Sequence, residues 1–531
     1  MEKKLQFVAN LCFMSMFLGA TREVSWPSSF LFFPLYLLVG FLTNTWLVAG
    51  GFAWRGAPAA GTNIIPGPIG WPLLGSIPVL MGPHAHRKLA KISAALGAKR
   101  LMALSFGCTR VVISSHPETA REILSGAAFA DRPPKEAARL LMFELAIGFA
   151  PSGDHWRHLR RLATTHLFSP RPIAGREVLR RRVAGEMLEE VGKVMNERGM
   201  VELRAILQRG SLKSVMGGVL GSDEGAIWSG SGEMMRMVYE GYDLIGKFNL
   251  SDHLPLSWFF DTVQGLGGRC RKLADEVKLF MGEIIEQKRR ILAEEEGPYK
   301  LGHDDFLTAL LSLPSDQEQL SDSQATAVLW ELIFRGTDTV AVLMEWTMTR
   351  MVLHPEVQAK VQEELDSVVG KCSGTTVGES DIAHLRYLHA VVKEVLRLHP
   401  PGPLLSWARL ATRDVHVGKH LVPKGTMAMV NMWAITHDAS IWKDPWEFRP
   451  ERFMEEEVSV MGSDLRLAPF GSGRRVCPGR ALGLATVHLW VASLLHQFNW
   501  VAFKSVDLSE HLGLSLEKKK PLQCRAFRRR V

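Results

Sequence analysis

One cysteine, Cys477, stands in a stretch of glycine, proline and arginine that neither a helix nor a strand would tolerate. The stretch APFGSGRRVCPGRALG covers residues 468–483 and contains four glycines, three arginines and two prolines. Glycine lets the backbone approach a flat, bulky group, and nearby arginines favour the thiolate, which is the metal-binding form of cysteine. A structural zinc or an iron–sulfur cluster would need further cysteine or histidine ligands. The loop therefore predicts heme with a single proximal thiolate ligand.

The composition is that of a folded protein with a basic surface. The 531-residue chain has 47% hydrophobic residues and a net charge of +8. A basic balance suits nucleic acid, an anionic membrane or an acidic partner. Because the sequence has neither zinc-finger spacing nor a compact basic helix, we expect no nucleic-acid partner. Six scattered cysteines without a CxxC pair favour a reducing compartment over a disulfide framework.

The N-terminal segment differs from the rest of the chain. No residue is charged between Glu23 and Arg55, and the apolar run 30–54 is long enough to cross a bilayer. The earlier apolar stretch 5–20 is either a signal-like segment or the first arm of a membrane hairpin. We predict an uncleaved anchor and flank over residues 1–62. A proline- and glycine-rich linker then opens the catalytic domain, residues 63–531.

The body is predicted to be mainly α with a smaller β region. Residues 100–115 and 415–430 predict β-hairpins, the second turned at residues 423–425. Ser321 and Gln324 form a capping-box signature that starts a long helix, which Pro355 stops. Its middle, RGTDT at residues 335–339, is polar, and Gly336 is expected to let the helix bulge there. A second helix places Glu394 and Arg397 on one face.

Several motifs, in chain order, resemble those of the cytochrome P450 family. Residues 156–160 (WRHLR) resemble the family's W-x-x-x-R helix, and residues 394–397 resemble its E-x-x-R motif. Residues 448–453 (FRPERF) resemble the segment that completes a Glu–Arg–Arg network. The cysteine loop matches through Phe470, Gly473, Arg475, Cys477 and Gly479. The resemblance runs from about residue 63 to the end of the chain. FRGTDTVA and the cysteine loop are most similar to plant microsomal members, in the KLUH/plastochron group of organ-growth regulators.

The resemblance implies a role for each motif residue. Cys477 is the expected axial ligand of the iron in heme b, within a loop shaped by Phe470, Gly473 and Gly479. The heme propionates are expected to be held by four residues, with Arg132 as a less specific candidate: Trp156, Arg160, Arg409 and Arg475. A structural ion network, rather than catalysis, is expected of Glu394, Arg397 and Arg452.

The distal side of the heme is assigned to the long helix. Asp338 and Thr339, an acid beside an alcohol, are expected to anchor water and relay protons during oxygen activation. The alternative for Thr339 is a hydroxyl that bonds back to its own helix. Arg335 departs from the family, which usually has alanine or glycine at that position. A long cation there leaves the shape of the distal pocket open.

The family implies a monooxygenase that inserts one atom of O₂ into a substrate. Because the sequence has no G-x-G-x-x-G, electrons are expected from NADPH through a separate cytochrome P450 reductase. Three largely apolar segments are expected to face a lipophilic substrate such as a fatty acid: residues 144–151, 400–406 and 511–516. We expect an endoplasmic reticulum membrane protein whose body faces the cytosol, so the sequon at Asn249 should carry no glycan.

Two other functions stay open at this point. A heme-thiolate isomerase or dehydratase of lipid hydroperoxides would need neither a proton relay nor a reductase. A non-enzymatic heme sensor would need neither a relay nor a deep apolar pocket. The match of residues 241–247 to a phosphate-binding loop is rejected, because Phe248 stands where a hydroxyl is required. Reductase-dependent consumption of O₂ separates the three functions.

Overall fold

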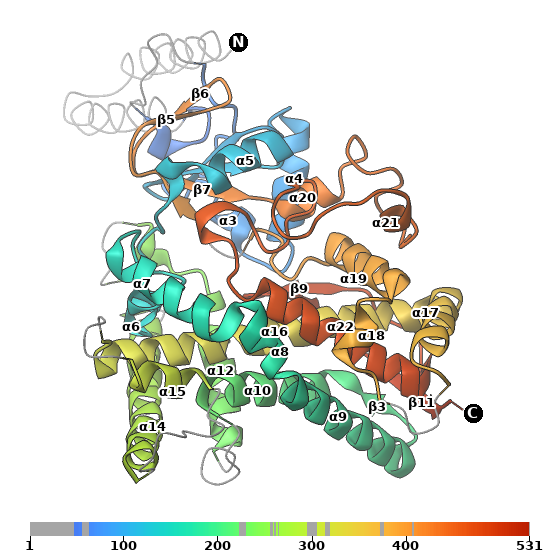
Figure 1. Ribbon diagram of the computed structural model, residues 1–531. Helices are drawn as coiled ribbons and strands as arrows, with labels where there is room; N and C mark the ends of the chain where they lie inside the picture. The colour runs from blue at the N-terminus through green and yellow to red at the C-terminus, as the bar shows by residue number, and fades with distance from the viewer. Residues whose placement is uncertain are drawn as a thin grey trace, which may run out of the picture.

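The computed structural model describes ten ranges of the chain: residues 47–55, 63–221, 230–254, 259, 262–263, 265–294, 305–313, 319–371, 376–405 and 408–529. In Figure 1, strands β5, β6 and β7 lie with short helices at the upper end of the body, and long helices fill most of the lower part, where β3 and β11 also lie. This arrangement confirms the predicted mainly α fold with a smaller β region. In the part of the chain that the structure describes, no helix is both long and apolar enough to cross a bilayer.

The helices account for most of the body. The longer ones are α4 (Ala85–Ala95), α5 (Pro117–Ser125), α7 (Asp154–Ala163), α9 (Glu177–Arg198), α10 (Leu203–Leu220), α12 (Ser231–Gly246), α14 (Leu266–Glu294), α16 (Asp322–Leu353), α17 (Pro355–Val368), α19 (Arg386–Leu398) and α22 (Arg480–Gln497). The shorter ones are α3 (Ile77–Leu80), α6 (Glu136–Leu140), α8 (Pro170–Gly175), α15 (Phe306–Leu311), α18 (Glu379–Ile382), α20 (Met432–Thr436) and α21 (Arg452–Glu455). Single turns are η1 (Phe52–Trp54), η2 (Ala127–Phe129), η3 (Phe143–Leu145), η4 (Thr164–Phe168), η5 (Leu250–Asp252) and η6 (Gly473–Arg475).

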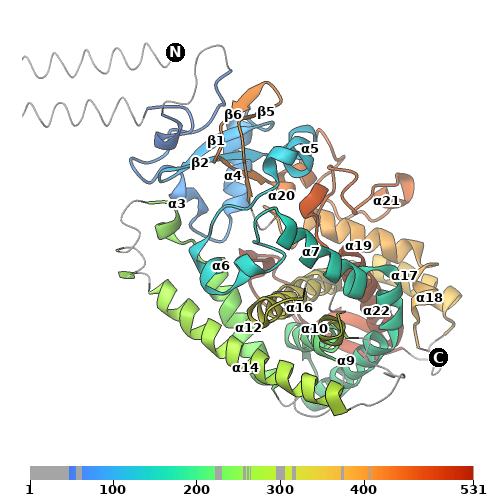
Figure 2. The ribbon, with the colours of Figure 1, turned by 60° about the vertical axis from the view of Figure 1, so that its left-hand side comes forward.

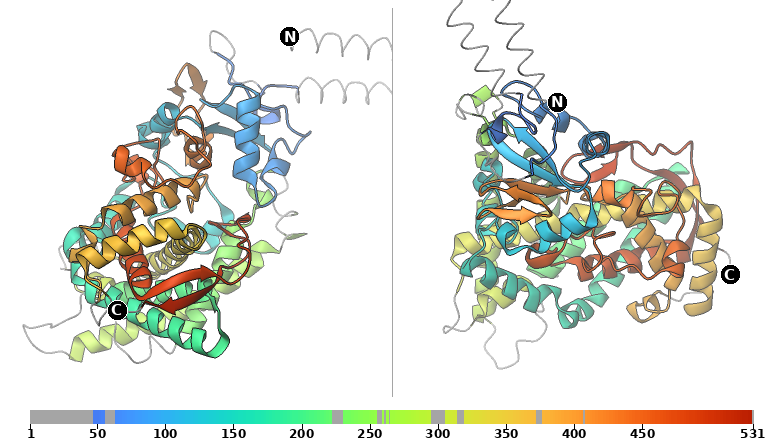
Figure 3. Two further views of the ribbon diagram at one scale, coloured as in Figure 1. Left: turned by 90° about the vertical axis from the view of Figure 1, so that its right-hand side faces the viewer. Right: turned by 90° about the horizontal axis from the view of Figure 1, so that it is seen from above.

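The strands form one four-stranded sheet and three smaller sheets. They are β1 (Met102–Phe106), β2 (Thr109–Ser114), β3 (Val201–Glu202), β4 (Arg409–Leu410), β5 (Val415–Val417), β6 (His420–Val422), β7 (Met427–Val430), β8 (Phe498–Ala502), β9 (Glu510–Leu512), β10 (Leu516–Lys518) and β11 (Gln523–Arg528). The sheets have the strand orders β1-β2-β7-β4, β3-β11-β8, β10-β9 and β5-β6. The right-hand view of Figure 3 shows the blue strands of the first sheet beside its orange ones.

The first predicted hairpin is confirmed and the second is wrong. β1 and β2 pair antiparallel, with Phe106 opposite Thr109. In the second segment the paired strands are β5 and β6, which turn at Gly418 rather than at residues 423–425. β7 leaves this pair and runs parallel to β2, with Val111 opposite Met427. Pairing with a distant strand, which local sequence does not encode, therefore decides the path of β7.

The predicted long helix is α16, and its start and end follow local rules. The Ser321 side chain accepts from the Gln324 backbone N–H, and the Gln324 side chain accepts in return from the Ser321 N–H. The helix ends at His354, directly before Pro355. The predicted bulge at Gly336 is wrong, because α16 is continuous there. A Cβ at Gly336 would lie 2.8 Å from a Val215 methyl carbon, so glycine instead allows α10 to approach.

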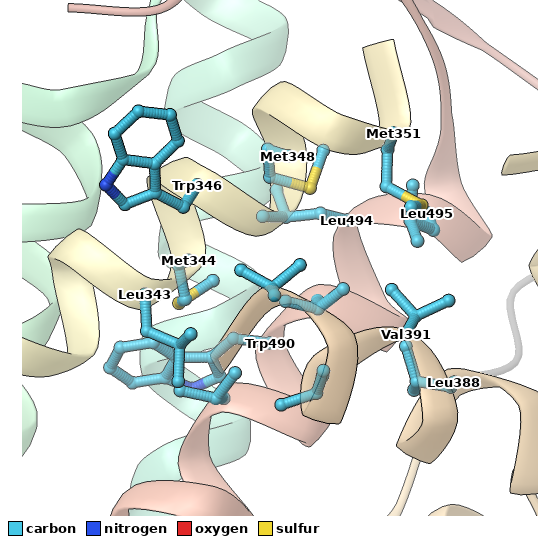
Figure 4. Close-up of a cluster of buried hydrophobic side chains, with 14 of the residues drawn as sticks. Leu343, Met344, Trp346, Met348, Met351, Leu388, Val391, Trp490, Leu494 and Leu495 are labelled. Carbon is cyan, nitrogen blue, oxygen red and sulfur yellow. The ribbon is translucent and has the colours of Figure 1, made fainter. Parts of the chain in front are cut away.

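The hydrophobic core continues along both halves of α16. Figure 2 shows α16 beside α10 near the middle of the helical region, with α14 along the outer edge. The C-terminal half of α16 packs against α19 and α22, where large apolar side chains meet (Figure 4). The residues labelled there are Leu343, Met344, Trp346, Met348, Met351, Leu388, Val391, Trp490, Leu494 and Leu495. This packing holds α16 against α19 and α22, since interiors of this kind are close-packed.

The last residues of the predicted membrane span belong to the folded body. Residues 47–54 form a turn and η1, and the indole N–H of Trp54 donates to the Leu104 carbonyl oxygen at 2.9 Å. Trp54 is 6% exposed, so it packs in the core of the body. The rest of the predicted span and the apolar stretch 5–20 lie outside the described residues. The predicted division at residue 62 stays a prediction.

Candidate functional site

Cys477 lies in the loop between η6 and α22, and glycine makes the path of this loop possible. The φ angles of Gly471 and Gly473 are 73° and 68°, values that side chains disfavour. A Cβ on Gly473 would also collide with the Leu124 carbonyl group of α5. The turn closes where the Cys477 backbone N–H donates to the Phe470 carbonyl oxygen at 3.0 Å. This turn places Cys477 in the wall of a large cavity.

The surroundings of the Cys477 thiol suit a metal ligand. Burial raises its pKa above the usual value for cysteine, and this is the largest influence. Four groups oppose it: the Gly479 backbone N–H and the guanidinium groups of Arg335, Arg160 and Arg480. A coordinated metal cation would complete the change to thiolate. Among the described residues no cluster of three or more His, Cys, Asp or Glu could hold a bare metal ion, so a metal here would belong to a cofactor.

Three of the predicted arginines converge on the same cavity from different elements. Arg160 comes from α7, Arg409 from β4 and Arg475 from η6, and Arg132 lines the cavity beside them. Burial lowers the pKa of Arg409 to about 9, and repulsion from Arg475 and Arg160 adds to the effect. Burial also lowers the pKa of Arg475 to about 10. Bound carboxylates would relieve this repulsion, so the cluster fits a cofactor that carries two of them.

Backbone carbonyl groups and one indole ring hold these arginines in place. Trp156 lies under Arg475, whose Cζ is 4.3 Å from the ring centroid, and the indole N–H donates to the Ile147 carbonyl oxygen at 3.1 Å. The arginines donate to the carbonyl oxygens of Ala130, Ile147 and Ala150 (Arg475), Val476 (Arg160) and Ser472 (Arg409). Trp156 thus contacts the arginines and the backbone, and its expected contribution to cofactor binding is indirect.

α16 presents Thr339 to the cavity and directs Asp338 elsewhere. Thr339 lines the cavity, and its hydroxyl makes one long contact, 3.5 Å, to the Arg335 carbonyl oxygen. Asp338 is 7% exposed and is absent from the cavity wall. Burial raises the pKa of Asp338 to about 6, and a hydrogen bond from the Ser515 side chain opposes this shift. Ser515 also lines the cavity, so it connects a buried acid with the space that Thr339 faces.

The cavity has the size of a ligand pocket. The space inside it that is open to a water-sized sphere is about 340 Å³, which lies within the roughly 300–1,000 Å³ of ordinary ligand pockets. All three segments that were expected to face a substrate reach it, through Ile147, Gly148, Pro401, Gly402, Leu405, Leu514 and Ser515. Sequence reasoning missed the contribution of α10, because nothing in its sequence marks the face that carries Ser211, Val215 and Val219.

The predicted Glu–Arg–Arg network lies behind the cysteine loop, away from the cavity. Glu394 and Arg397 are completely buried and form a double contact of 2.7 and 2.9 Å. Arg452, at the start of α21, donates to Glu394 at 3.1 Å. Arg397 also donates to the carbonyl oxygens of Thr436, Pro445 and Glu447. The network therefore ties α19 to the segment before the cysteine loop.

Comparisons with known proteins agree with this site. Residues 65–525 match the family model described as Cytochrome P450. Cytochrome P450 78A5 of Arabidopsis thaliana is 52% identical over 91% of this chain and 93% of its own length. Cytochrome P450 78A3 of Glycine max is 50% identical over 92% of this chain and 94% of its own length.

More distant proteins share the fold as well. The flavonoid 3'-monooxygenase of Petunia hybrida is 34% identical over 86% of this chain and 90% of its own length. A solved zebra fish cytochrome P450 with progesterone superposes with a TM-score of 0.67 at 25% identity. That match covers 83% of this chain and 99% of the zebra fish chain. The chain therefore belongs to the cytochrome P450 family, which implies a heme-thiolate cofactor, and it is a monooxygenase of the plant 78A group.

Proposed function

We propose that this monooxygenase oxidises a lipophilic substrate of the fatty-acid type and that the product is a signal in plant organ growth. The observation that carries the substrate class is the cavity between Cys477 and Thr339. Apolar side chains from α10, α16 and the turn after β9 form part of its wall, through Val215, Leu343 and Leu514 respectively. Apolar wall of this kind favours a substrate with a large hydrocarbon part.

In this proposal each part of the site has one task. Cys477 holds the heme, which when bound supplies the activation of O₂ and its insertion into a substrate C–H bond. Arg160, Arg409 and Arg475 hold the cofactor carboxylates. Asp338, with its pKa near 6, can both release and accept a proton at neutral pH. Ser515 and the Thr339 hydroxyl pass that proton between the Asp338 carboxyl group and the cavity.

Electrons come in this proposal from NADPH through a separate cytochrome P450 reductase. The surface around the cysteine loop supports an acidic partner, because Arg157 and Arg161 of α7 and Arg474 of η6 are exposed. Complementary charge of this kind steers a partner to its docking site.

We further propose that the protein sits at the endoplasmic reticulum membrane with its body toward the cytosol. Exposed apolar side chains in the segment that follows the predicted anchor support a membrane surface nearby. Four of them are more than half exposed: Ile64, Trp71, Leu73 and Met81. Several large apolar side chains exposed within one short segment suit contact with a membrane surface.

The test is product analysis with the full-length protein, reductase, NADPH and a panel of fatty acids. We expect hydroxylated product that requires both reductase and NADPH. In Thr339→Ala, heme content and substrate affinity should stay near those of the wild type. The ratio of product to NADPH oxidised should fall strongly, because general acid–base groups contribute about 10²–10⁴-fold to rates. Conversion of lipid hydroperoxides without reductase, together with an unchanged ratio in the variant, would favour the isomerase instead.

A further inference from the structure

Arg335 is a cation in the wall of the substrate cavity that the mechanism above does not use. It lies one helical turn before Thr339 on α16, and it lines the same cavity. About a third of its side chain, 34%, is exposed. The cofactor arginines come from α7, β4 and η6, whereas Arg335 comes from the helix that carries the predicted proton relay. A charged group at this place needs a partner, and Arg335 has one in Glu331.

The position of the Arg335 side chain is built by three elements of the structure. Its Nε donates to Glu331 Oε1 at 2.9 Å. Glu331 is 2% exposed and also accepts from the Gly148 backbone N–H, at 3.0 Å through Oε1 and 2.9 Å through Oε2. Phe149 lies next to the guanidinium, with its ring centroid 5.6 Å from Cζ. Glu331 is therefore a buried clamp that holds Arg335 at the edge of the cavity.

Glycine at position 148 is part of this arrangement. A Cβ there would collide with both Glu331 Oε1 and Arg335 Nη2. A side chain at position 148 would therefore push aside the ends of the Glu331 and Arg335 side chains, which Gly148 leaves in place. The clamp engages Arg335 through the Nε–H group of its guanidinium. A guanidinium fixed in this way suits a carboxylate, because the planar fork matches two oxygens.

We propose that Arg335, clamped by Glu331, binds the carboxylate of the substrate, so that the enzyme selects lipophilic acids over neutral lipids. This inference rests on the proposed function, which supplies the hydrocarbon part of the substrate. The apolar part of the wall receives the hydrocarbon chain, and Arg335, the cation that α16 contributes to the wall, receives the head group. Arg335 is then a specificity residue, because it determines which carbon of the substrate's hydrocarbon chain is oxidised.

The test compares dodecanoic acid with dodecanol on the heme-loaded full-length protein. The two probes share one hydrocarbon chain and differ in the head group. Arg335→Met removes the charge, Arg335→Lys restores it, and Arg176→Met removes another arginine of the cavity wall as a matched control. Dissociation constants come from the shift in the heme spectrum on binding, and heme content and melting temperature show that each variant is folded.

In Arg335→Met we expect the dissociation constant of dodecanoic acid to rise by about tenfold or more, the size of a lost hydrogen bond to a charged group. The value for dodecanol should change by less than about twofold. Arg335→Lys should recover part of the affinity for the acid, and Arg176→Met should alter neither probe selectively. The position of oxidation on the acid should spread over more carbons in Arg335→Met, since its anchor is gone.

Three results would overturn this inference. The first is equal loss of acid and alcohol binding in Arg335→Met. The second is loss of heme in a folded Arg335→Met protein, which would assign Arg335 to the cofactor. The third is a wild type that binds no carboxylate. The proposed function fails separately, when the wild type binds dodecanoic acid through Arg335 but reductase and NADPH oxidise no acid in the panel.

Discussion

Replacing Arg397 by methionine should cost more stability than the same replacement of Arg452 in the Glu–Arg–Arg network. Arg397 is completely buried and donates five hydrogen bonds, two to Glu394 and three to backbone carbonyl oxygens. Methionine fills much of the same volume but donates none of these bonds. Removing one partner of a buried ion pair costs about 3–5 kcal/mol, and Glu394 would keep only the single side-chain bond from Arg452 after losing its double contact. We expect a loss of that size for Arg397→Met.

Arg452→Met is the matched control within the same network. Arg452 donates one bond to Glu394, at 3.1 Å, and two to the carbonyl oxygens of Lys443 and Asp444. Glu394 keeps its double contact with Arg397 in this variant, so its charge stays paired. The expected loss is about 1–3 kcal/mol, as for a hydrogen bond to a charged group. Arg397→Met should therefore destabilise the protein more than Arg452→Met.

The assay is urea unfolding of both variants, followed by far-ultraviolet circular dichroism and by the reduced carbon monoxide spectrum. The helical signal reports the whole body, and the heme spectrum reports the cysteine loop that the network supports. A loss below about 1 kcal/mol for Arg397→Met would refute the reasoning, since it would mean that the buried acceptors find other partners. An equal or larger loss for Arg452→Met would refute the ranking.

Three further predictions concern single residues. Cys477→Ala should abolish the thiolate–heme spectrum and all activity, and a normal reduced carbon monoxide spectrum in this variant would remove Cys477 as the ligand. Asp338→Asn should make the protein more stable at pH 7.5 by up to about 3 kcal/mol. The pKa of Asp338 near 6 in the folded protein lies above its unfolded value. Ionisation of this buried acid therefore lowers the stability of the wild type as pH rises from about 4 to about 6. This gain should vanish below about pH 4, and identical pH profiles of unfolding would contradict the assignment. Asn249 is 2% exposed and its side chain is hydrogen-bonded to Ser251. Endoglycosidase treatment should therefore leave the mass of the protein unchanged. A mass shift on this treatment that is absent in Asn249→Gln would show that Asn249 is glycosylated.

The sequence by itself determined the features that depend on neighbours along the chain. The capping box at Ser321, the stop at Pro355 and the face shared by Glu394 and Arg397 follow from contacts within four residues or fewer. The cysteine loop follows the same logic, because positive φ angles at Gly471 and Gly473 are a local requirement. Together these features were enough to indicate the family and the fold class, since each motif acts through its own residue types and spacing.

Only the tertiary structure decided which distant residues meet. β7 pairs with β2 across more than three hundred residues of chain, and this pairing overturned the hairpin that local alternation predicted. Asp338 and Thr339 are adjacent in sequence but differ in their surroundings. The turn that carries Ser515 packs beside Asp338, whereas Thr339 borders the cavity. Likewise, Arg335 could be recognised as unusual from sequence, but the clamp formed by Glu331 and Gly148 could not. Helix caps and turns are stabilised by contacts between residues a few positions apart, so local sequence predicts them. The burial of a charge depends instead on packing between distant segments, which come together only when the chain folds.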